Sequence, residues 1–125
     1  MIDAKQLRIG NIILLQTSQG DYDVHIIEKG NEIDDNSRLS YIPITRQILE
    51  NAGFTKANFE GEEIDNLWKL GRYFSATEFP EVGIEVYCIG ERVPAKYVHQ
   101  LQNIYYAITG SELNLPVEKI KKSEL

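Results

Sequence analysis

Cysteine, histidine and long apolar runs are all scarce in this chain. Its 125 residues include one cysteine and two histidines, too few for a structural zinc site, which takes about four such ligands. Cys88 cannot form an internal disulfide, which agrees with a reducing compartment. The longest strongly apolar run, 12–15, is far shorter than the roughly 20 residues that cross a bilayer, and Asp3 stands where a signal peptide would be positively charged. We therefore expect a cytoplasmic protein without a membrane segment.

Positive charge is also in short supply. Thirteen Lys and Arg residues stand against nineteen Asp and Glu residues, so the formal net charge is −6. An acidic chain repels a phosphate backbone at long range, and no basic run offsets this repulsion, so we expect no binding to duplex DNA. The nearest basic cluster, Lys119, Lys121 and Lys122, is interspersed with acidic residues. We predict that 114–125 is a solvated tail.

The common catalytic and metal-binding motifs are absent as well. No G-x-S-x-G, Walker or Rossmann glycine pattern occurs, which argues against the usual hydrolase and nucleotide chemistries. A small hydrolase using Cys88 and His99 is a weak alternative, because Cys88 falls in an alternating strand pattern typical of a buried, inert thiol. The acidic stretches "NEIDDNS" and "FEGEEIDN" lack the spacing of a calcium loop and are interpreted as solvated loops. We predict no catalytic residues, no cofactor and no metal.

What is present is the composition of an ordinary globular protein. With 42% hydrophobic and 26% charged residues, the chain suits a single α+β domain over 1–125. Its first part, 1–44, is β-rich: "LRIGNIILL" predicts a strand bent at Gly10-Asn11, "YDVHIIEKGNEI" a strand turning at Gly30-Asn31, and "SRLSYIPI" a third strand. These pieces predict a small bent antiparallel sheet or a barrel-like part.

A short helix and more strands follow. Thr45 is a natural N-cap and Gly53 suits the left-handed position after a helix, so 45–54 is predicted to be a short helix. The stretches "NLWKLGRYF" and "GIEVYCIGERV" predict a second antiparallel strand pair over 63–93, in which Ile84, Val86 and Cys88 share one face.

Aromatic residues in these strands have two interpretations. They could form a base-stacking platform, although aromatic side chains in alternating strands are more often core. The candidates are Trp68, Tyr73, Phe74, Tyr87 and Tyr41, with Lys69, Arg72 and Arg92 as the nearby cations.

The last predicted element is an amphipathic helix over 95–109, packed on the sheet and ending at Thr109-Gly110. At 100° per residue its apolar side chains fill an arc of about 120°, the width of a core-facing stripe. They are Tyr97, Val98, Leu101, Ile104, Tyr105 and Ile108. The opposite face carries what we call the polar strip: His99, Gln102, Asn103 and Tyr106.

Three stretches carry a resemblance to known sequences. "LRIGN", "PIT" opening a short helix that closes with "GF", and "KYVHQLQNIYYAITGSEL" together resemble a group of small uncharacterised proteins of Bacteroidetes and of their phages and mobile elements. Residues 55–92 are outside the resemblance. Within the matched stretches this chain departs at Arg46, Gln47 and Tyr106. The resemblance implies a genomic context and no particular chemistry.

The polar strip itself has two interpretations. Its side chains can satisfy buried backbone where the middle of the chain crosses the helix, or they can be presented to a partner, with Tyr106 as the anchor. We expect Gln102 and Asn103 to clamp a segment and Tyr106 to be exposed. The function predicted is a non-enzymatic protein-binding or accessory module. The alternative is RNA or single-stranded DNA binding through the N-terminal β-rich part, and the oligomeric state is left open.

Overall fold

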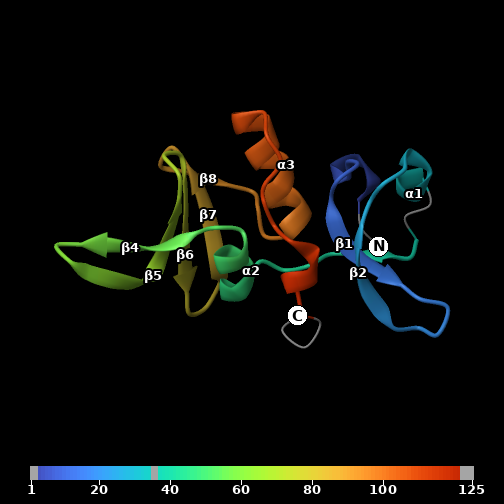
Figure 1. Ribbon diagram of the computed structural model, residues 1–125, viewed down its shortest axis with the longest axis horizontal. Helices are drawn as coiled ribbons and strands as arrows, with labels where there is room; N and C mark the ends of the chain where they lie inside the picture. The colour runs from blue at the N-terminus through green and yellow to red at the C-terminus, as the bar shows by residue number, and fades with distance from the viewer. Residues whose placement is uncertain (1–2, 35–36, 122–125) are drawn as a thin grey trace.

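A computed structural model, which describes residues 3–34 and 37–121, shows two antiparallel sheets on either side of a C-terminal helix (Figure 1). The N-terminal sheet has the strand order β2-β1-β3, and the C-terminal sheet has the order β4-β5-β6-β7-β8. Helix α3 (Val98–Thr109) lies between the sheets, with the short helix α2 (Arg46–Asn51) near its start. The predicted α+β class is confirmed.

The N-terminal sheet is small and open. Its central strand β1 (Ile12–Gln16) pairs with β2 (Tyr22–Ile26) and with β3 (Leu39–Ser40). These strands do not close into a barrel within the described ranges, so the barrel-like alternative is wrong. One side of this sheet covers a small apolar cluster of Ile13, Ile27 and Leu39.

Two segments of the N-terminal part differ from the prediction. Residues 7–11 are not strand: the 3-10 turn η1 (Ala4–Gln6) precedes them, and Gly10, with φ of 96°, turns the chain into β1. The expected turn at Gly30-Asn31 is the start of helix α1 (Gly30–Asp34). There the Glu32 carboxylate accepts the backbone N–H groups of Glu28 and Lys29 at 2.7 and 2.9 Å, which satisfies N–H groups at a helix start. Residues 35–36 of "NEIDDNS" lie outside the described residues.

The caps predicted for the middle helix are confirmed. The Thr45 hydroxyl oxygen accepts the N–H of Ile48 at 3.2 Å, and Gly53 adopts a φ of 96° just beyond the helix. Ile48 and Leu49 are buried, so this short helix is stabilised by packing on the core as well as by its caps.

One strand pair was predicted over 63–93, but residues 55–93 form a five-stranded meander: β4 (Thr55–Phe59), β5 (Glu62–Leu70), β6 (Phe74–Phe79), β7 (Gly83–Cys88) and β8 (Glu91–Val93). Gly71 divides "NLWKLGRYF" into two strands, and tight turns at Glu60-Gly61 and Ile89-Gly90 add the outermost ones. Both turns have positive φ at two successive residues, as type I′ hairpin turns require. The sequence hides them because Glu60 and Ile89 are residue types that rarely adopt positive φ. "FEGEEIDN" is therefore a hairpin, not a loop.

One apolar core joins both sheets to α3. The inner face of the five-stranded sheet contributes Trp68, Phe74, Val86 and Cys88, and Ile84 packs against them, so the shared face predicted for β7 is confirmed. Ile12 of the N-terminal sheet belongs to the same cluster. The two sheets therefore share one apolar core.

The predicted solvated tail is wrong as far as Ile120. Leu113, Leu115 and Ile120 are buried in the main core, and the segment between them contains the 3-10 turn η2 (Val117–Lys119). Leu113 and Leu115 alternate as in a strand, but the alternation is short, and Ile120 is out of step with it and lies among lysines. The sequence therefore predicted no buried element here. Residues 122–125 lie outside the described part.

Candidate functional site

The polar strip is divided between the interior and the surface. His99 and Gln102 are buried, Asn103 is half-buried and Tyr106 is 44% exposed. The first three lie where the N-terminal segment 6–12 crosses α3. The crossing segment was expected from the middle of the chain, and that expectation is wrong. Because α3 lies between two sheets, a face turned away from one sheet meets the other half of the molecule.

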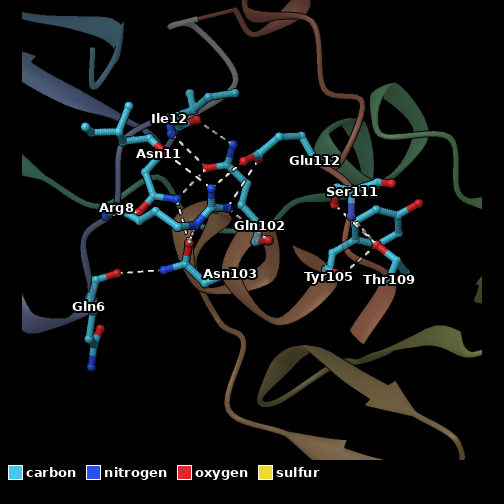
Figure 2. Close-up of polar contacts among 12 residues, drawn as sticks. Gln6, Arg8, Asn11, Ile12, Gln102, Asn103, Tyr105, Thr109, Ser111 and Glu112 are labelled. Atoms are coloured by element: carbon cyan, nitrogen blue, oxygen red, sulfur yellow. Dashed lines mark hydrogen bonds and ion pairs between the residues drawn. The ribbon is translucent and has the colours of Figure 1, made fainter. Parts of the chain in front are cut away.

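Gln102 binds the N-terminal segment through both atoms of its amide (Figure 2). Its Oε1 accepts the backbone N–H of Ile12 at 2.7 Å, and its Nε2 donates to the carbonyl oxygen of Gly10 at 3.1 Å. The side chain therefore acts as a short strand partner for the backbone just before β1. The buried Ile12 N–H and the partly buried Gly10 carbonyl, which no strand pairs, are satisfied in this way.

Asn103 extends the same contact toward the surface. Its Nδ2 donates to the carbonyl oxygen of Gln6 at 2.7 Å, while its Oδ1 accepts from Arg8 Nε at 2.9 Å and from Asn11 Nδ2 at 2.8 Å. Asn11 is itself fully buried, and its Oδ1 accepts the backbone N–H of Arg8 at 2.8 Å. The network fixes the N-terminal segment at several points at once.

Arg8 links this network to the exposed end of the strip. Its guanidinium makes a two-point ion pair with Glu112, with Nη2 to Oε2 at 3.2 Å. It also lies 4.7 Å from the centre of the Tyr106 ring, within the range of a cation–π contact. Gly10 suits this position because its φ of 96° is a backbone conformation that L side chains rarely adopt.

His99 is held in an aromatic stack. Its ring lies 6.0 Å from that of Tyr41 and 6.2 Å from that of Tyr97, nearly parallel to both. Burial lowers the pKa of His99 to about 4, so its imidazole is neutral at neutral pH. Its Nε2 is 3.4 Å from Gln6 Oε1, and no residue in the described ranges is hydrogen-bonded to Nδ1. The His99 imidazole is thus packed in the interior in its uncharged form.

The alternative hydrolase pair is not assembled. Cys88 is buried in the main core on β7, whereas His99 faces the N-terminal segment, and neither histidine is hydrogen-bonded to Cys88 in the part described. Within those same residues no cluster of three or more metal-binding side chains occurs. No helix there is long and apolar enough to span a bilayer.

Sequence reasoning missed three members of this site: Arg8, Asn11 and Glu112. They lie at opposite ends of the chain, and nothing in residue spacing links positions about a hundred residues apart. The signal available was local, since Gly10-Asn11 indicates a turn and Glu112 follows the helix-ending glycine Gly110.

Comparison with known proteins gives no match. No family model fits the chain, and neither a curated protein nor a solved structure is similar to it.

Proposed function

We propose that the protein is a non-catalytic module that binds another protein through the surface formed by Arg8, Ile9 and Tyr106, here called the Tyr106 surface. One observation carries this proposal: the exposed Tyr106 ring has the Arg8 guanidinium held over it. Tyrosine and arginine are enriched among the residues that dominate binding energy at protein interfaces. Ile9 follows Arg8 in the chain and is 54% exposed, and we propose that it adds apolar area to the contact.

The Tyr106 surface is also arranged before any partner arrives. Arg8 is fixed by Asn103 and Glu112, so its long side chain has already lost rotamer freedom. Ordering such a side chain at an interface costs about 0.5–1.5 kcal/mol. A surface whose arginine is already ordered keeps more of its contact energy as affinity.

Nucleic-acid binding through the N-terminal sheet is less well supported. Tyr22 is exposed there, but its neighbours Asp21 and Asp23 are acidic. Base-stacking surfaces combine aromatic rings with positive charge that follows the phosphate backbone, and this edge of the molecule has the opposite sign.

Site-specific photo-crosslinking tests the proposal. A photoreactive residue replaces Tyr106 in one variant and Tyr22, a tyrosine of similar exposure on the other side of the N-terminal part, in the control. A protein trapped from native extract at position 106 but not at 22 is then purified and titrated against the unlabelled chain by calorimetry. We expect Tyr106→Ala to weaken that binding by at least about 30-fold, the loss typical of an anchor residue, and Tyr22→Ala to leave it unchanged. Equal affinities of Tyr106→Ala and the parent chain would contradict the proposal.

A further inference from the structure

The outer face of the five-stranded sheet is uncovered. Helices α2 and α3 lie on its inner side (Figure 1), and the outward-facing Leu67 and Tyr87 belong to neither apolar cluster of the described residues. Directly paired residues share a face of a sheet. The strand register therefore places one row of side chains across all five strands: Thr55, Lys69, Ser75, Tyr87 and Arg92.

Unpaired positive charge gathers at one side of this row. Lys69 and Arg72 make no ion pair within 3–34 and 37–121, in contrast to Arg8, Arg46 and Lys56, whose charges are each matched by a nearby carboxylate. Arg92 Nη1 is 3.5 Å from Glu85 Oε2, but the Arg92 side chain is 69% exposed. Single lysines elsewhere on the described surface, such as Lys5 and Lys29, also lack an ion pair, but here two unpaired cations lie together in a chain of net charge −6.

A hollow of about 370 Å³ lies at the same corner, lined by Lys69, Arg72, Tyr73, Ser75 and Ile89 among others. Small-ligand sites start at about 300 Å³, so it has room for a phosphate group and part of a nucleotide. Two cations and two hydroxyl groups are suited to bind phosphate oxygens. The exposed Tyr73 ring and the row's Tyr87 supply aromatic surface next to them.

The turn at the edge of the hollow is strained. Ile89 has a φ of 53° and is 70% exposed, although β-branched residues strongly disfavour this conformation and water. Its backbone N–H donates to the Tyr73 carbonyl oxygen at 2.8 Å, which holds the turn against the hollow. Backbone strain of this kind concentrates at binding sites, where it orients a side chain for contact.

We propose that this outer face binds single-stranded nucleic acid. A phosphate occupies the hollow against Lys69 and Arg72, and the neighbouring bases contact Tyr73, Tyr87 and Ile89. The aromatic and apolar residues favour this ligand over an acidic peptide, because carboxylates gain nothing from a stacking surface. A duplex is excluded, since its bases are stacked on one another and cannot lie on the sheet.

The direct test is fluorescence anisotropy, in which the full chain is titrated into labelled oligo(U) or oligo(dT) of eight nucleotides at 50 and 200 mM salt. We expect dissociation constants of about 1–100 µM at the higher salt, the range of sequence-independent binding near physiological salt, and tighter binding at the lower salt. Each phosphate contact on a single strand contributes about −0.7 to the slope of log affinity against log salt. Lys69→Ala and Arg72→Ala should each make that slope shallower by about 0.7, whereas the exposed lysine variants Lys5→Ala and Lys29→Ala should not change it.

Two further variants separate stacking from charge and from folding. Tyr87→Ala should weaken binding by about 5- to 150-fold, the equivalent of one lost base–aromatic stack, while Tyr22→Ala should not. Ile89→Asn creates the Asn-Gly pair that this turn type prefers, so its melting temperature should hold or rise while its affinity falls. A loss of affinity in that variant cannot come from unfolding.

Four results would overturn the proposal. They are no binding below about 1 mM at 50 mM salt, equal affinity for a duplex of the same length, equal affinity for polyglutamate, or affinities of Lys69→Ala and Tyr87→Ala that match the parent chain.

Discussion

Helix α3 meets the two halves of the molecule by different means. It buries Val98 and Leu101 in the main apolar core, which includes the inner face of the five-stranded sheet, whereas it presents the amides of Gln102 and Asn103 to the N-terminal segment. Apolar packing stabilises in proportion to the area buried and has no preferred direction. Amide hydrogen bonds hold one register, because each donor must meet its acceptor. The first contact provides most of the stability, and the second fixes where the N-terminal segment lies.

The largest effect we predict comes from the apolar side of this comparison. Leu101→Ala removes a fully buried side chain and should lower the free energy of unfolding by about 2–5 kcal/mol, measured by urea denaturation. Ile108 on the same helix was predicted to lie in the apolar stripe but is 49% exposed. Ile108→Ala is therefore the control and should change stability by no more than about 0.5 kcal/mol. Equal losses in the two variants would contradict this account of the helix.

A smaller loss is expected on the amide side. Gln102→Leu keeps roughly the same volume but leaves the Ile12 N–H and the Gly10 carbonyl without their partner, and each unsatisfied buried group costs about 1–3 kcal/mol. Thermal and urea unfolding measure the change. Gln100→Leu is unsuitable as a control because Gln100 Oε1 accepts the N–H groups of Lys96 and Tyr97 at the helix start. Gln47→Leu on α2, where the side chain is exposed, should be near neutral and serves instead.

Burial of His99 should make the stability of the folded protein depend on pH. Its pKa is about 4 in the folded protein against about 6.5 in the unfolded chain. Between these values the unfolded chain binds a proton that the folded chain does not, so stability is full above about pH 6.5 and declines as pH falls toward 4. We expect the free energy of unfolding, measured by urea denaturation at each pH, to fall by about 1–3 kcal/mol between pH 7.5 and 4.5.

His99→Phe keeps an aromatic ring in the stack with Tyr41 and Tyr97 and should flatten this decline. Glu32 titrates in a different window, because the backbone N–H groups of Lys29 and Glu28 lower its pKa to about 2. Its contribution is lost only as pH falls below about 4.5, so it does not produce the same decline. An unchanged pH profile in His99→Phe would show that another group is responsible.

The smallest effect is expected at the exposed end of the strip. Tyr106→Ala removes a ring that is 44% exposed and a cation–π contact worth about 0.5–1 kcal/mol at such a site. The melting temperature should therefore fall by only a few degrees. A loss as large as that of Gln102→Leu would make Tyr106 a structural residue and leave the Tyr106 surface without its anchor.

Features that depend on a few neighbouring residues were predictable from the sequence. Thr45 and Gly53 define the middle helix, Gly110 ends α3 with a φ of 76°, and the alternation of Ile84, Val86 and Cys88 identifies a buried strand face. Each depends on local backbone chemistry or on a fixed side-chain period, and both can be read along the chain.

Features that depend on a distant partner were not. The Gln102 amide is a group able to bind backbone, as the sequence indicates. Its partners lie about ninety residues earlier, and no local pattern predicts them. Ile108 follows the apolar period of α3, yet the last turn extends past the sheet, so the period overstates its burial. The positive φ of Ile89 also has no local signal, because only the surrounding hairpin forces it.

Hydrogen exchange at the Ile12 amide tests most directly whether Gln102 holds the N-terminal segment to α3. In the parent chain this amide should exchange slowly, as a buried N–H bonded to Gln102 Oε1. In Gln102→Leu it should lose more protection than the amides of β6, which is paired on both sides and reports opening of the five-stranded sheet. Equal loss of protection at Ile12 and in β6 would contradict the account, because the amide would then contribute only to overall stability and not to the placement of the segment.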